Sequence, residues 1–165
     1  MQADTGDKLA ATLDYFRKNS DTGLMRDILQ ILERPGCEQD KDQVLRLCME
    51  IKSADLAVEV LDFACETGDA AVRKMLLEIL WQINQDLSCR ARKVSELLLG
   101  SADYDTAFHC YTILDNCCDC VEPSEAKDIS LRLTMAAPDA GNIMRGLIVS
   151  AAECMGGKML DYDGI

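Results

Sequence analysis

Proline, histidine and aromatic residues are scarce in this chain. Its 165 residues include three prolines, one histidine, one tryptophan, four tyrosines and three phenylalanines. The prolines occur only at breaks in the apolar pattern, in the segments ERPGC, VEPSE and AAPDAG. Because proline interrupts helix interiors and central strands, this placement leaves long segments between the prolines that can form unbroken helices.

Positive charge is also in short supply. Seventeen lysines and arginines stand against 29 aspartates and glutamates, which gives a formal net charge of −12 at pH 7. Such a chain repels phosphate backbones and anionic lipid surfaces, so we expect neither nucleic-acid binding nor membrane binding. The charge favours a protein or peptide partner with a basic segment, which long-range attraction would steer toward the chain.

Long apolar runs are missing as well. No window approaches the roughly 18 uncharged apolar residues of a membrane-spanning helix. The N-terminal stretch MQADTGDKLAATLDYFRKNS lacks the apolar core of a signal peptide. The nine cysteines are an odd number and too sparse for a small disulfide scaffold. We therefore expect an intracellular protein with reduced thiols, in the cytoplasm or the nucleus.

Helical periodicity runs through the whole sequence, whereas strand signals are nearly absent. Val44, Leu47, Cys48 and Ile51, for example, follow the i, i+3, i+4, i+7 spacing of a buried helix face. Caps and breakers place helices at about 6–19, 22–34, 40–52, 54–67, 70–85, 88–99, 103–120, 124–136 and 139–155. The predicted fold is all-α, with about nine short antiparallel helices in a single domain over residues 1–165, or in a fragment of a longer array.

The predicted helix at 70–85 is apolar over most of its circumference. Leu77 and Trp81 lie beside the main apolar row from Val72 to Ile83, and only a narrow polar strip is left. A helix of this kind must contact neighbours on two sides. This is typical of an inner helix in a layered stack.

An internal similarity at an offset of about 48 residues suggests repeats. The segment SDTGLMRDILQIL from Ser20 aligns with GDAAVRKMLLEIL from Gly68, which pairs Ile28 with Leu76 and Leu32 with Leu80. The identity between the two segments is low. Both are amphipathic helix patterns, and two such patterns can align their apolar positions by chance.

The segment ETGDAAVRKMLLEILWQI resembles the second helix of a HEAT or armadillo-type repeat, in which an aspartate in the turn precedes a Val-Arg pair and a leucine-rich stripe. Asp69 can cap this helix, and Arg73 can reach an acidic group in the preceding turn or in a neighbouring repeat. The resemblance is best over residues 54–84, and the same pattern is not found elsewhere. It implies a small right-handed α-solenoid whose inner helices line a protein-binding surface. An irregular helical bundle is the alternative.

The stretch HCYTILDNCCDC, residues 109–120, carries the densest chemistry in the sequence. On one continuous helix its four cysteines fall on the apolar side, so we expect them to act as small buried hydrophobic residues. His109 is expected at the surface or at the boundary, and it lies about 16 Å along the axis from Cys120, too far to share a metal ion. A metal or redox role for Cys117, Cys118 and Cys120 is the weaker alternative, and it gains weight if the helix ends near Asn116.

Catalytic motifs are not found in the sequence. The only histidine, His109, is followed by Cys110, which points about 100° away on a helix, so the two make a poor nucleophile–base pair. Phosphate-binding glycine loops need a preceding strand, and none is predicted. We therefore expect no catalytic residues, no cofactor and no enzymatic activity.

The sequence favours a non-enzymatic module that binds a partner protein or peptide on its inner helical face. The candidate contact residues are Arg73, Lys74, Trp81, Gln82, Tyr104, Phe108 and Tyr111, which include the residue types that usually anchor interfaces. Two alternatives stay open: a compact acidic inhibitor of the immunity-protein type that masks a basic active site, and a cysteine-based metal or redox sensor. Self-association through apolar residues of the end helices, for example Ile143 to Cys154, is a further expectation.

Overall fold

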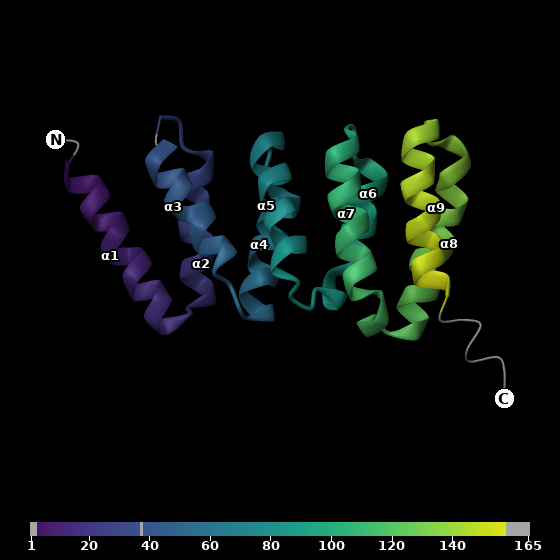
Figure 1. Ribbon diagram of the computed structural model, residues 1–165, viewed down its shortest axis with the longest axis horizontal. Coiled ribbons are helices and arrows are strands. Elements are labelled where there is room, and N and C mark those ends of the chain that lie inside the picture. Colours follow the sequence, from purple (N-terminus) through teal and green to yellow (C-terminus); the bar gives the residue numbers. More distant parts are fainter. Residues whose placement is uncertain (1–2, 37, 158–165) are drawn as a thin grey trace. The chain divides into compact units, whose positions relative to one another are not determined.

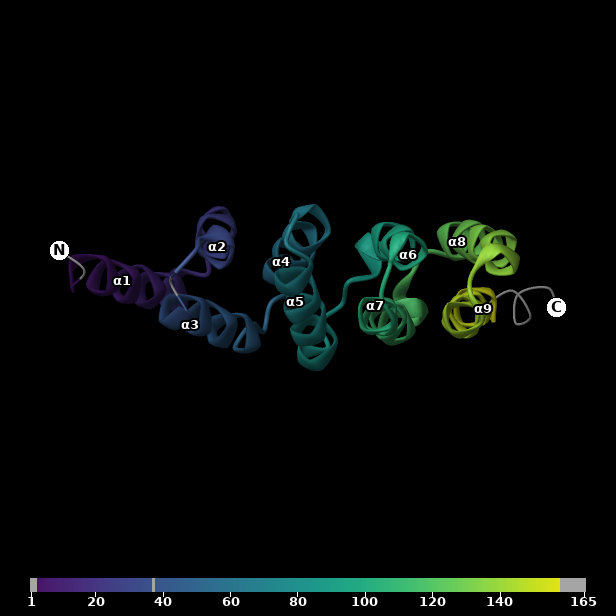
Figure 2. The same cartoon turned by 90° about the horizontal axis from the view of Figure 1, so that it is seen from above.

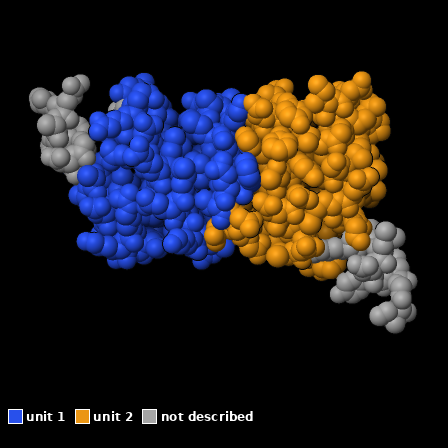
Figure 3. Space-filling model, viewed as in Figure 1, with its two compact units in different colours: residues 1–83 blue, residues 84–165 orange. Residues whose placement is uncertain are grey.

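The computed structural model describes residues 3–36 and 38–157, and within these ranges it contains nine α-helices and no strand (Figure 1). The predicted all-α fold class is therefore confirmed, and each helix overlaps a predicted one. In this described part, no helix has both the length and the apolar character needed to cross a bilayer. The chain divides into two compact units, Met1–Ile83 and Asn84–Ile165, which Figure 3 shows in different colours.

The first unit is built from stacked helices in two layers. Its helices are α1 (Ala3–Asn19), α2 (Thr22–Leu29), α3 (Glu38–Met49), α4 (Ala54–Glu66) and α5 (Ala70–Ile83), and the 3-10 turn η1 (Gln30–Glu33) continues α2. Helix α2 packs against α4, α3 packs against α5, and α4 and α5 pack on each other (Figure 2). One layer therefore holds the first helix of each hairpin, and the other layer holds the second.

The second unit repeats this layout. It contains η2 (Ser88–Arg90), α6 (Ala91–Gly100), α7 (Tyr104–Cys117), η3 (Cys118–Cys120), α8 (Pro123–Ala136), η4 (Ala137–Asp139) and α9 (Asn142–Gly156). The hairpins α6–α7 and α8–α9 stack so that α6 contacts α8 and α7 contacts α9. Each unit thus consists mainly of two helical hairpins with equivalent helices side by side.

The two segments that align at an offset of 48 residues do not occupy equivalent positions in the structure, so this predicted repeat is wrong. It superposes α2, which lies in the layer of α4, on α5, which lies in the layer of α3. Both helices bury an apolar row because every helix of a stack is amphipathic, so the shared pattern does not distinguish the two layers. In the first unit, the element that recurs is instead the hairpin, beginning at Thr22 and again at Ala54.

Helix α5 is buried on two sides, as its sequence predicts. Leu76, Leu77 and Leu80 are at most 1% exposed, and the helix packs against both α3 and α4. Trp81 is half-buried beside this row. The apolar width of the helix therefore reflects its contacts with two neighbours in the first unit.

The turn before α5 joins it to α4 through Asp69 and Arg73. One Asp69 carboxylate oxygen accepts hydrogen bonds from the backbone N–H groups of Ala71 (2.9 Å) and Val72 (3.1 Å), which confirms the predicted N-cap. Arg73 does not reach an acidic group in the turn, contrary to expectation. Its guanidinium donates to the carbonyl oxygens of Ala64 (3.1 Å) and Thr67 at the end of α4, where helix carbonyls lack intrahelical donors.

Arg145 of α9 makes the same kind of hydrogen bonds to backbone carbonyls. Its Nε donates to the Ala137 carbonyl oxygen at 3.2 Å, and its Nη2 donates to Pro138 at 2.8 Å and to Ala140 at 3.3 Å. Arg145 follows the N-cap Gly141 by four positions, just as Arg73 follows Asp69. The sequence pattern does not identify this counterpart because glycine replaces the capping aspartate. Arg145 nevertheless donates to carbonyl oxygens at the end of the preceding helix, as Arg73 does.

Replacing Arg73 by leucine should lower the free energy of unfolding of the first unit by about 1–3 kcal/mol, because the carbonyl oxygens of two buried residues, Ala64 and Thr67, lose a charged donor. Trp81, the only tryptophan, lies in this unit, so urea denaturation followed by tryptophan fluorescence measures the effect. Arg46→Leu on the exposed side of α3 is the matched control and should change stability little. Equal effects of the two substitutions would contradict a capping role for Arg73.

Candidate functional site

The candidate contact residues of α5 are only partly available at the surface. Arg73 is held at the end of α4, Lys74 and Trp81 are half-buried, and Gln82 is exposed. The Gln82 side-chain nitrogen lies 3.5 Å from a carboxylate oxygen of Glu78, one turn earlier. Of these four predicted residues, Arg73 therefore has a structural role. The sequence alone did not distinguish this role from partner binding.

The three candidate residues of α7 form one row on the helix. Tyr104 and Phe108 are 47% and 38% exposed, and their rings stack with centroids 6.1 Å apart and planes inclined by 21°. Tyr111 follows at the next turn and is half-buried. Spacings of four and three residues place all three side chains on one helix face, which we call the aromatic row.

Two carboxylates lie next to the aromatic row. Asp115 continues it by one turn, Asp105 lies beside it, and both are exposed. Partial burial, followed by the negative charge of Asp115 and the nearby thiols of Cys154 and Cys118, raises the pKa of Tyr111 above its usual range. Helix α7 contains no lysine or arginine, so its surface combines flat aromatic rings with negative charge.

Asp103 fixes the start of the aromatic row. Its carboxylate accepts a hydrogen bond from the backbone N–H of Thr106 at 2.9 Å, which makes it the N-cap of α7. Tyr104 is therefore the first residue of the helix, and its ring can stack on Phe108 one turn later. Asp103 therefore caps α7 in the same way that Asp69 caps α5.

His109 lies inside the protein, not at its surface. It is 9% exposed, and its ring meets the Phe108 ring edge-on with centroids 6.1 Å apart and an interplanar angle of 62°. Helix α7 packs against both α6 and α9, so positions beside its apolar row are covered too. The expectation of a surface or boundary position underestimated the number of neighbours around this helix.

The cysteine-rich segment does not continue as one helix. Helix α7 ends at Cys117, and residues Cys118–Cys120 form the 3-10 turn η3. Cys110 and Cys117 are 0% and 2% exposed, as predicted, and burial raises the pKa of the Cys117 thiol to about 12. Cys118 is half-buried and Cys120 is exposed, so their placement in the buried row was wrong. The tighter turn changes the direction of the side chains that follow Cys117.

The candidate metal ligands remain separate in the described part of the chain, where no group of three or more histidine, cysteine, aspartate or glutamate side chains is arranged to hold a metal ion. The Cys117 thiol donates to the carbonyl oxygen of Leu114 at 3.7 Å. The Cys118 thiol donates to that of Asp115 at 3.3 Å. These sulfur contacts are local to the end of α7.

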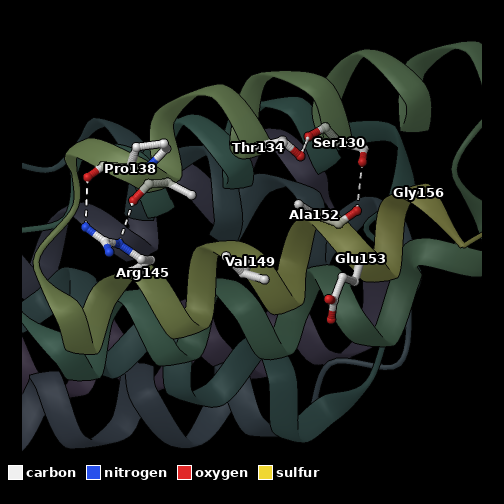
Figure 4. Close-up of a pocket in the computed structure, with 9 residues that line it drawn as sticks. Ser130, Thr134, Pro138, Arg145, Val149, Ala152, Glu153 and Gly156 are labelled. Atoms are coloured by element: carbon white, nitrogen blue, oxygen red, sulfur yellow. Dashed lines mark hydrogen bonds between the residues drawn. The ribbon is translucent and has the colours of Figure 1, made fainter.

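A groove between α8 and α9, which the sequence did not indicate, has a volume of about 580 Å³ (Figure 4). Its lining residues are Ser130, Thr134, Ala137, Pro138, Arg145, Val149, Ala152, Glu153 and Gly156. The Ser130 hydroxyl donates to the Ala152 carbonyl oxygen at 2.8 Å across the groove. Because Arg145 is engaged with backbone carbonyls, the groove offers mainly small apolar groups.

Exposed apolar side chains accompany this groove on the same hairpin. Leu131 and Met135 of α8 are 58% and 71% exposed, and Ile143 of α9 is 71% exposed. Leu147, Ile148 and Ala151 are buried, so only part of the apolar pattern of the last helix reaches the surface. In the sequence, the apolar residues of the last two helices were the one feature that could have indicated this surface.

Gly156 should be intolerant of a methyl group, whereas Gly146 on the same helix should accept one. A Cβ at position 156 would lie 2.8 Å from the Ser130 Oγ, and a Cβ at position 146 meets nothing within 4 Å. Gly146→Ala should raise stability by up to about 1 kcal/mol through helix propensity. Gly156→Ala should be destabilising unless it is combined with Ser130→Ala, and thermal unfolding followed by circular dichroism measures all three variants. Equal behaviour of the two single alanine variants would contradict the contact.

Three comparisons with known proteins found no match. No protein-family model matches the sequence, and neither a curated protein nor a solved structure matches the chain.

Proposed function

We propose that this chain is a non-enzymatic protein-interaction module whose aromatic row, Tyr104, Phe108 and Tyr111, binds a basic segment of a partner protein. The observation that carries the proposal is the exposed Tyr104–Phe108 stack on a helix with carboxylates and without lysine or arginine. Large aromatic side chains left partly exposed are the usual anchors of protein interfaces.

The chemistry of the row suits arginine and lysine side chains. Arginine stacks on aromatic rings, an interaction of about 0.5–1 kcal/mol at exposed sites. Asp115, in line with the row, and Asp105, beside it, can pair with the same or a neighbouring cation. The net charge of −12 would accelerate the encounter with a basic segment.

The hairpin architecture supports the wider proposal of a small HEAT- or armadillo-like array. In each unit, first helices pack on first helices and second helices on second helices, as repeats of this kind require. In such an array α7 is a second helix, the kind of helix that lines the inner surface. The α5 part of the proposed surface rests on Lys74, Trp81 and Gln82, because Arg73 is engaged at the end of α4.

The proposed setting is a reducing compartment. Three of the described cysteines, Cys48, Cys110 and Cys117, are packed in the interior. Buried cysteine in these positions serves as a small hydrophobic residue, which supports the expectation of a cytoplasmic or nuclear protein.

Selection of peptides from a random displayed library on the immobilised protein tests the proposal. Enriched peptides should carry arginine or lysine together with apolar residues. Phe108→Ala should weaken the binding of an enriched peptide at least tenfold, as truncation of an interface anchor does. Leu131→Ala, which truncates another exposed apolar residue in the same unit, should leave the affinity within about twofold. Enrichment of acidic peptides, or equal losses for both variants, would overturn the proposal.

The salt dependence of the same binding separates the module from an acidic inhibitor of the immunity-protein type. Salt should slow the association of both complexes, because charge steers both partners. Between low and high salt, a complex anchored by aromatic side chains should lose much less affinity than a charge-driven inhibitor complex, because buried apolar contacts are not screened.

A further inference from the structure

The groove between α8 and α9 has a charged side chain at each end and an apolar middle. Arg145 lies at one end, Glu153 and Gly156 lie at the other, and Val149 lies between them (Figure 4). Arg145 and Gly156 are about 16 Å apart along the axis of α9, at about 1.5 Å of rise per residue. The volume of about 580 Å³ is within the range of about 300–1,000 Å³ that is usual for small-molecule sites. The groove can therefore hold one small molecule in an extended conformation.

The hydroxyl groups along the groove already donate to backbone carbonyl oxygens. Ser130 donates to Ala152 at 2.8 Å, and Thr134 donates to Ser130 at 2.8 Å. Val149 is 38% exposed, so apolar surface is left for a ligand to cover. An extended peptide lying here would lose hydrogen bonds between its backbone and water, and these hydroxyl protons would not replace them. A hydrocarbon chain has no such groups, so it fits the middle of the groove better.

Arg145 keeps charge and donors for an anion at its end of the groove. Its Nε and Nη2 atoms donate to the carbonyl oxygens of Ala137, Pro138 and Ala140, which hold the guanidinium in place. Among the residues that the structure describes, its Nη1 atom has no hydrogen-bond partner and no carboxylate pairs with it. Backbone carbonyls carry only partial negative charge, so the charge of Arg145 is not neutralised. The N-terminal end of α9, whose N-cap Gly141 provides no side-chain cap, adds positive potential there.

We propose that this groove binds a medium-chain monocarboxylate of the fatty-acid type. The ligand carboxylate accepts hydrogen bonds from Nη1 of Arg145, and the hydrocarbon chain runs past Val149 toward Gly156. Glu153 repels a carboxylate at the opposite end, so the ligand binds in one direction. The site does not rest on the proposed binding of a basic segment by the aromatic row, and either proposal can fail alone.

NMR titration of the full chain with decanoate, 1-decanol and decylammonium tests the proposal, because these ligands share one hydrocarbon chain and differ in the charge of the head group. Decanoate should bind at least about tenfold more tightly than decylammonium and should shift the amide signals of α8 and α9 most. The net charge of −12 alone would favour the cation, so the expected order is the reverse of nonspecific attraction. Equal affinities of the three ligands, or tighter binding of decylammonium, would overturn the proposal.

Variants of the groove separate its middle from its charged end. Val149→Glu places a carboxylate in the middle and should weaken decanoate binding at least about tenfold. Leu131→Glu makes the same change of charge at an exposed apolar position of the same hairpin that does not line the groove, so the affinity should stay within about twofold. Equal effects of these two substitutions would exclude the groove as the site.

Arg145→Gln should weaken decanoate binding at least about tenfold and leave 1-decanol binding within about twofold, because a neutral head group does not need the guanidinium charge. Binding of 1-decanol also shows whether the groove is intact in this variant. Unchanged decanoate affinity in Arg145→Gln would contradict the role of Arg145. The comparison of head groups on the wild-type chain does not depend on the folding of any variant.

Analytical ultracentrifugation of the ligand-free chain distinguishes a ligand site from an interface between two copies. The wild type and Val149→Glu should sediment alike, because a ligand site does not hold copies together. If the wild type is instead a dimer that Val149→Glu dissociates, a second copy occupies the groove and the ligand proposal is wrong.

Discussion

The packing of like helices from successive hairpins is the constraint on which the rest of this structure depends. A single helical hairpin leaves an apolar side of each helix open, and the next hairpin covers it, with α2 on α4 and α3 on α5 in one unit, and α6 on α8 and α7 on α9 in the other. Small residues at the contacts, among them Ala57, Ala64 and Ala107, are completely buried and let the helices approach closely.

The same constraint decides which side chains are left for binding. Helix α7 uses one side for α6 and another for α9, and the aromatic row lies on the part that neither neighbour covers completely. Arg73 and Arg145 show the reverse case, because both guanidiniums are drawn into closing the end of the preceding helix. An arginine near a helix start in such a stack is therefore weak evidence for a binding site.

Residue patterns predicted much of the fold because each helix carries its own signals. Caps such as Asp69 and Asp103, the three prolines and the apolar rows are local features, and they placed the helices correctly. The alignment of α2 with α5 failed because amphipathic helices of both layers share one period. Cys118 and Cys120 were misplaced because the change from an α-helix to a 3-10 turn after Cys117 leaves no clear mark in the sequence.

The sequence by itself determined the all-α class, the helix segments, the acidic charge and the residues of the aromatic row, because these follow from local periodicity and composition. Only the tertiary structure decided that Tyr104 and Phe108 stack at the surface, that Arg73 closes a helix end, and that His109 is buried. The physical reason is that exposure and partnership depend on which helices pack together. Those contacts join residues far apart in the chain, where no local pattern records them.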